Sequence, residues 1–167
     1  MGILSWIKKD KKNTPIVFHS KKELSNEYII RGEDMANANN LAGAINYFDK
    51  ALEINPQNDC AWGDKGLILT KQGKLEEALK SFSKAIAINP NSEITWHNQG
   101  LTQMKIKRFE EAIESFDKAI KIKNSYAKAW YNKGRALAII GKIKLAQDCF
   151  DKARKLDPTL YTKLRKL

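Results

Sequence analysis

The residues in this sequence best suited to catalysis or metal binding are two cysteines and two histidines, Cys60, Cys149, His19 and His97. A thiolate or an imidazole can serve as a nucleophile or a metal ligand when partner residues lie within reach. None of the four has a second cysteine or histidine at a ligand spacing in the sequence. We therefore expect inert thiols, no metal site and no bound cofactor.

Phosphate-binding and catalytic motifs are also missing from the sequence. It contains no Gly-x-x-x-x-Gly-Lys-Ser/Thr loop, no Gly-x-Gly-x-x-Gly turn and no His-Glu-x-x-His helix. The Gly73-Lys74 pair has no upstream glycine at the spacing that a phosphate-cradling loop needs. The sequence therefore predicts a protein that binds other molecules and has no enzyme activity.

The helices that must position any binding residues come from an internal repeat with a period of 34 residues. A tryptophan recurs with this period, and a glycine follows it four residues later. A phenylalanine recurs with the same period, with an alanine four residues before it and another three residues after it. We assign to the repeated structural core Trp62, Gly66, Ala78, Phe82, Trp96, Gly100, Ala112, Phe116, Trp130, Gly134, Ala146 and Phe150.

Each repeat predicts two helices that pack closely against each other. In the second repeat the helices are expected at residues 61–71 and 75–88, with Gly73 as the break between them. A glycine inside a helix costs about 1 kcal/mol relative to alanine. Because this cost recurs at one register, we expect the paired helices to approach closely there, with the aromatic side chains filling the space between them.

The pattern Trp-x-x-(Lys/Gln)-Gly, then Ala-x-x-x-Phe-x-x-Ala, then proline, resembles the tetratricopeptide repeat (TPR). It covers units one to four, at residues 25–58, 59–92, 93–126 and 127–160. Asn124 replaces the proline of unit three, and Tyr28 replaces the tryptophan of unit one. The resemblance implies an all-α fold, a right-handed α-solenoid of four TPR helix-turn-helix units. It also implies a non-catalytic scaffold or adaptor for protein–protein interaction.

In the family that the repeat resembles, the first helix of each unit lines a concave groove that receives peptides. By that resemblance we expect the peptide site at Ile94, Asn98, Leu101, Lys128, Tyr131, Asn132 and Arg135. Asparagine can hydrogen-bond a peptide backbone, and lysine and arginine can bind a carboxylate. We do not expect the carboxylate clamp of some family members, because Gly63 and Leu67 replace its lysine and asparagine.

The net charge of +11 is distributed unevenly along the chain. Unit one carries a net charge of −3, whereas unit four carries +5 and the last seven residues add +3. The basic end favours a partner protein or peptide with an acidic segment. A nucleic-acid-binding repeat that uses this end is the alternative, although glutamate pairs at 76–77 and 110–111 interrupt any continuous basic stripe.

The two ends of the chain lie outside the four units. In unit four Gln147 and Arg154 replace apolar residues of the earlier second helices, so we expect the stack to end there. Residues 161–167 are expected to form a short C-terminal capping helix. Residues 1–24 form a basic segment with two open interpretations. One is a tail that packs loosely on unit one or is disordered, and the other is a weak membrane anchor through residues 1–12.

The sequence shows no export signal and no apolar run long enough to span a membrane, so we expect a cytoplasmic protein. The ends of a short solenoid can also associate with each other. Homodimer formation through an exposed terminal stripe is therefore a further alternative.

Overall fold

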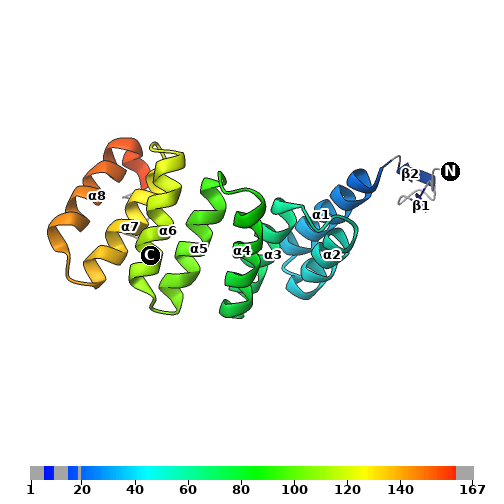
Figure 1. Cartoon of the computed structure of the whole chain (residues 1–167), viewed down its shortest axis with the longest axis horizontal. Helices are drawn as coiled ribbons and strands as arrows, with labels where there is room; N and C mark the ends of the chain where they lie inside the picture. Colours follow the sequence, from blue (N-terminus) through cyan, green and yellow to red (C-terminus); the bar gives the residue numbers. More distant parts are fainter. Residues whose placement is uncertain (1–5, 10–14, 19, 161–167) are drawn as a thin grey trace.

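The computed structural model describes residues 6–9, 15–18 and 20–160. Its helices are α1 (Lys21–Asn37), α2 (Leu41–Ile54), α3 (Asp59–Lys71), α4 (Leu75–Ile88), α5 (Glu93–Lys105), α6 (Phe109–Ile122), α7 (Ala127–Ile139) and α8 (Ile143–Leu156). They follow one another along a single axis, so that each helix pair stacks on the next (Figure 1). An antiparallel hairpin of β1 (Trp6–Lys9) and β2 (Pro15–Phe18) precedes α1.

The four helix pairs confirm the all-α solenoid predicted from the repeat, and the N-terminal end adds two features. The hairpin of β1 and β2 was not predicted. The first helix begins at Lys21, because Ser20 and Glu23 form a capping box. The boundary predicted after residue 24 therefore lies inside α1. The predicted capping helix at 161–167 lies outside the described residues.

Close packing of a phenylalanine against a helix glycine holds each pair together. Phe82 of α4 is fully buried, and a Cβ atom on Gly66 of α3 would lie only 2.7 Å from its Cε1 atom. The glycines at the same register in the other units, Gly32, Gly100 and Gly134, face their own phenylalanines at 2.6–2.7 Å. Only glycine lets the two helices approach this closely.

The repeated tryptophans are half-buried and tie each unit to the one before it. The indole N–H of Trp62 donates to the carbonyl oxygen of Pro56 at 3.0 Å. Trp130 makes the same hydrogen bond to Asn124 at 2.9 Å. Because the acceptor is a backbone oxygen, asparagine replaces the usual proline here without loss of the contact.

A lysine–aspartate ion pair at one register links successive units at two of the three junctions. Lys65 Nζ lies 2.5 Å from Asp49 Oδ1, and Lys133 Nζ lies 2.5 Å from Asp117 Oδ1. At the junction of units two and three, the same positions hold Gln99 and a serine, Ser83. The side-chain oxygen of Gln99 is buried there with no hydrogen-bond partner among the described residues. This junction therefore lacks the lysine–aspartate pair, and here Arg108 of unit three lies 3.4 Å from Glu76 of unit two.

The turn inside each unit uses a left-handed residue at one fixed register. These residues are Asn39, Gly73, Lys107 and Gly141, with φ between 58° and 79°. In each turn the next residue donates its N–H back to the helix, as Arg108 does to the Gln103 carbonyl at 2.9 Å. Lysine at this conformation is unusual, because its Cβ crowds the backbone.

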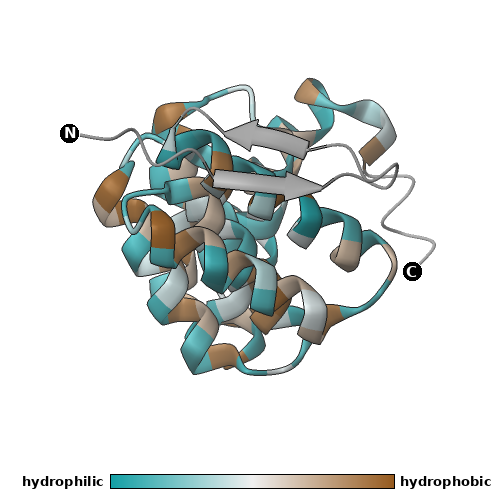
Figure 2. Cartoon of the chain, turned by 90° about the vertical axis from the view of Figure 1, so that its right-hand side faces the viewer, coloured by the Kyte–Doolittle hydropathy of each residue, from teal (hydrophilic) through white to brown (hydrophobic). Residues whose placement is uncertain are grey.

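The helix surfaces fit a water-facing solenoid. Viewed from the end at which α1 lies, hydrophobic and hydrophilic residues alternate along the helices (Figure 2), as expected for helices that bury one face. None of the described helices is long and apolar enough to cross a membrane.

Candidate functional site

Two neighbouring pockets open between the first helices of units two, three and four. The pocket between α3 and α5 has a volume of about 200 Å³ and is lined by Leu67, Thr70, Lys71, Phe82, Asn98, Leu101, Thr102 and Lys105. The pocket between α5 and α7 has a volume of about 460 Å³ and is lined by Leu101, Met104, Lys105, Lys107, Phe109, Arg135 and Ile139. Leu101 and Lys105 belong to both, so the pockets adjoin, and together they are here called the trench.

The trench combines apolar walls with a cationic rim. Its charged lining residues are Lys71, Lys105, Lys107 and Arg135, and no acidic residue lines either pocket within the described part of the chain. Lys71 and Lys105 sit in the last turns of α3 and α5, where a cation also suits the helix dipole. The arrangement can bind a ligand that carries both apolar groups and carboxylates.

A pair of threonines fixes the spacing of α3 and α5 at the trench floor. The hydroxyls of Thr70 and Thr102 lie 2.9 Å apart, so one donates to the other. The hydroxyl that accepts this bond can donate in turn to the carbonyl oxygen four residues earlier in its own helix, Gly66 for Thr70 or Asn98 for Thr102. Thr102 is fully buried. This link holds the two walls of the smaller pocket in a fixed relation.

His97 is buried beside the trench and organises Asn132 and Arg135. Its Nε2 atom accepts a hydrogen bond of 3.0 Å from the Asn132 amide nitrogen, and the Asn132 oxygen accepts one of 3.3 Å from Arg135. The ring packs against Phe116 and Tyr126. Burial and, to a lesser extent, the positive charge of Lys128 lower the pKa of His97 to about 4. The imidazole is therefore neutral at pH 7 and serves as an acceptor.

The structure brings together only part of the predicted peptide site. Asn98, Leu101 and Arg135 line the trench. The side chain of Asn132 hydrogen-bonds to His97 and Arg135. The ring of Tyr131 packs against that of Phe150, with the ring centroids 5.6 Å apart. Exposed residues outside both pockets are Ile94 and Lys128.

Several residues of the trench were not part of the predicted site. Met104 and Ile139 provide apolar surface, and Lys71 and Lys105 provide charge. All four lie in the last turns of first helices, at positions that the resemblance assigns to the concave groove. Lys107 lies in the turn that follows α5, so helical periodicity gave no signal for it.

The cysteines show no activating environment. Cys60 is exposed. The partial burial of its thiol and the nearby carboxylates of Asp59, Asp64 and Glu33 raise its pKa. Burial also raises the pKa of Cys149. Within the described part of the chain, no three His, Cys, Asp or Glu side chains are grouped so that they could hold a metal ion.

Two acidic residues of the first helices, Glu33 and Asp64, lie outside the trench. Burial, with a smaller effect from the negative charge of Glu33, raises the pKa of Asp64 to about 6. Glu33 and Asp64 belong to units one and two, whereas the cations of the trench lie between the end of α3 and α7.

Comparison with known proteins identifies the family of the repeat. Sequence models described as tetratricopeptide repeat or TPR repeat match residues 25–58, 60–92, 104–141 and 127–160. An uncharacterized protein of Methanocaldococcus jannaschii is 38% identical over 50 residues. That match covers 30% of this chain and 58% of the relative's length.

Two solved structures illustrate the similarity in fold. MamA from Desulfovibrio magneticus superposes with a TM-score of 0.74 at 24% identity, covering 81% of this chain and 76% of that one. The second TPR of Spaghetti, bound to the HSP90 peptide SRMEEVD, superposes with a TM-score of 0.59 at 29% identity. That alignment covers 62% of this chain and 95% of the other.

Proposed function

The chain belongs to the tetratricopeptide repeat family, and from this premise we propose that it is a non-catalytic adaptor that binds an acidic peptide segment in the trench. The fold supports a protein–protein interaction scaffold in general. The finer proposal concerns which surface binds and what it selects.

One observation carries the proposal. The trench combines apolar walls with four cations, and no acidic residue lines it among the described residues. Leu101, Met104 and Ile139 offer apolar contact, and the cations around them can pair with carboxylates. In an extended peptide alternate side chains point to opposite faces. Apolar side chains can thus enter the pockets while neighbouring carboxylates reach the rim.

The peptide complex of the second TPR of Spaghetti supports the idea by analogy. Its peptide, SRMEEVD, is acidic. This chain has Gly63 and Leu67 in place of the clamp lysine and asparagine, and the proposed contacts use other residues. We therefore expect selection for apolar side chains flanked by acids, without a requirement for a free C-terminal carboxylate.

Charge reversal in the trench tests the proposal. Fluorescein-labelled peptides in which leucines are flanked by glutamates, with an amidated C-terminus, are titrated with the whole chain and followed by anisotropy. The double variant Lys105→Glu/Arg135→Glu should weaken binding about tenfold, or by about 1.4 kcal/mol. Peptides with lysine in place of glutamate should not bind the parent chain.

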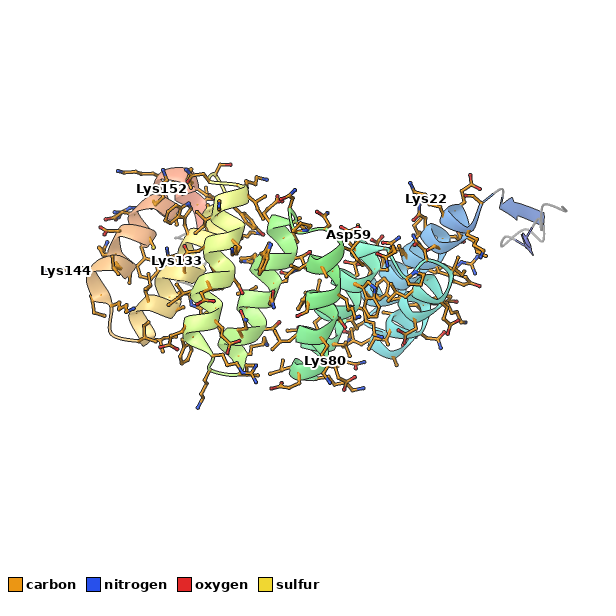
Figure 3. The ribbon with its side chains drawn as sticks, in the orientation of Figure 1. Lys22, Asp59, Lys80, Lys133, Lys144 and Lys152 are labelled. Carbon is orange, nitrogen blue, oxygen red and sulfur yellow. The ribbon has the colours of Figure 1, made fainter. Side chains whose placement is uncertain are left out.

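A matched control separates the trench from the overall charge of the protein. Lys118→Glu/Lys152→Glu makes the same change in net charge on the second helices α6 and α8, where both lysines are exposed; Lys152 is labelled in Figure 3. Its affinity should stay within about twofold of the parent. Equal weakening by both variants, or tighter binding of a single-stranded RNA probe that is lost in the same way, would refute the peptide site.

A further inference from the structure

The turn between α7 and α8 carries a surface that the turns of units two and three lack. In those units the second and third residues of the second helix are glutamates, at 76–77 and 110–111. In unit four the same positions hold Lys144 and Leu145. Ile139 likewise stands where units two and three have lysine. We call Ile139, Lys142, Ile143, Lys144 and Leu145 the unit-four tip.

The apolar side chains of the unit-four tip are exposed. Ile139 is 55% exposed, Ile143 is 63% exposed and Leu145 is 53% exposed. The exposure of Ile143 follows from the end of the stack, since in unit three the equivalent Phe109 packs into the pocket shared with unit four. Ile139 and Leu145 occupy positions that are exposed in units two and three as well. Folding therefore does not require apolar residues there.

The unit-four tip also lacks the first-turn glutamates that stabilise the N-termini of α4 and α6. Each of α4 and α6 has two glutamates in its first turn, which suit the positive end of the helix dipole. The first turn of α8 has no acidic residue, whereas the N-cap residues of all three helices, Lys74, Arg108 and Lys142, lack a side-chain capping bond. Lys144 adds a second cation at this positive end. Side chains that oppose local stability in this way indicate a role in binding.

We propose that the unit-four tip docks the protein onto an anionic lipid surface. Ile139, Ile143 and Leu145 enter the interface between headgroups and acyl chains, and Lys142 and Lys144 pair with lipid phosphates. This surface shares Ile139 with the trench, whereas Lys142, Ile143, Lys144 and Leu145 lie outside both pockets. The test below changes residues 143 and 145 and so does not depend on the peptide proposal.

The shape and charge of the unit-four tip favour lipid over other occupants. The α7–α8 turn protrudes at the end of the solenoid opposite β1 and β2 (Figure 1), and Lys144 lies on its outer edge (Figure 3). A bilayer can receive a protruding turn without a matching pocket, whereas a protein partner would need one. The C-terminal residues Lys163, Arg165 and Lys166 carry the same charge as the turn, which disfavours that segment as its cover.

Co-sedimentation with vesicles tests the proposal. The whole chain is mixed with vesicles of phosphatidylcholine alone or of phosphatidylcholine with phosphatidylglycerol, and we expect binding to the anionic vesicles only. Ile143→Glu/Leu145→Glu should lower the partition coefficient about tenfold. Glutamate at position 145 is the residue type of units two and three and suits the helix dipole. The variant should therefore keep its helix content, as circular dichroism will show.

A matched control uses exposed isoleucines elsewhere. Ile30→Glu/Ile94→Glu alters side chains that are 54% and 57% exposed on α1 and α5, and it should leave vesicle binding unchanged. The proposal is overturned if both double variants lose binding equally, or if the tip variant keeps full binding. It also fails if Lys8→Glu/Lys9→Glu alone abolishes binding. Absence of binding to anionic vesicles by the parent chain would equally reject it.

Discussion

Replacement of Lys107 by glycine should stabilise the protein. Lys107 has a φ of 62°, and the equivalent residues Gly73 and Gly141 have a φ of 79°. The backbone hydrogen bonds around Lys107, from its own N–H to Met104 and from Arg108 to Gln103, do not involve its side chain. Because the side chain is exposed, its removal creates no cavity. The substitution therefore changes mainly the free-energy cost of the left-handed backbone conformation at residue 107.

Two opposing terms set the size of the effect. A left-handed conformation costs a residue with a Cβ roughly 1–2 kcal/mol. Glycine gives the unfolded chain more freedom, which lowers stability by about 0.4–1 kcal/mol. The net gain for Lys107→Gly is then about 0.5–1 kcal/mol. For a chain of this size it corresponds to a rise in Tm of roughly 1–4 °C.

Urea denaturation monitored by circular dichroism provides the measurement. Gly73→Lys is the matched reverse change, since a Cβ at Gly73 would meet nothing within 4 Å, and it should lose a similar amount of stability. The denaturant midpoints should shift in opposite directions with unchanged slopes. A lower midpoint for Lys107→Gly, or no loss for Gly73→Lys, would show that left-handed strain does not govern this turn.

Two further predictions concern the unit junction and the buried ionisable groups. Ser83→Asp combined with Gln99→Lys installs the ion pair of the other junctions and should raise the unfolding free energy by about 1 kcal/mol; a double-mutant cycle without positive coupling would contradict this. Between about pH 4 and 6.5, His97 and Asp64 act in opposite directions. On acidification the unfolded chain takes up a proton at the histidine, which lowers stability, whereas the folded chain takes one up at the aspartate, which raises it. Relative to the parent, His97→Leu should therefore gain stability between pH 7 and about pH 4, and Asp64→Asn should lose it, each by on the order of 1 kcal/mol. Unchanged pH profiles in both variants would contradict the assigned burial.

The fold could be predicted because its contacts repeat with the sequence. The register of Phe82 and Gly66 recurs in every unit, and each pair meets within one helical hairpin. The early start of α1 was also readable, since Ser20 and Glu23 have the spacing of a capping box. The left-handed conformation of Lys107 was not, because lysine carries no preference for it and the neighbouring helices impose it.

The candidate site was predicted only in part, because its contacts join different units. Asn132 matched the residue type and register of a ligand-binding position. Its hydrogen bond to His97, 35 residues earlier in the sequence, depends on how α7 rotates against α5. Lys105 belongs to the candidate site because it lines the pockets on both sides of α5. Neither relation is encoded in the period of one helix.

The junction between units two and three is held by contacts of a different kind from those at the other two. Gln99 and Ser83 stand where the other junctions have a lysine–aspartate pair, whereas the Thr70–Thr102 hydrogen bond and the Arg108–Glu76 ion pair cross this junction. The smaller pocket spans the same junction, with α3 on one side and α5 on the other. The width of this part of the trench therefore depends on a single bond between two threonine hydroxyls.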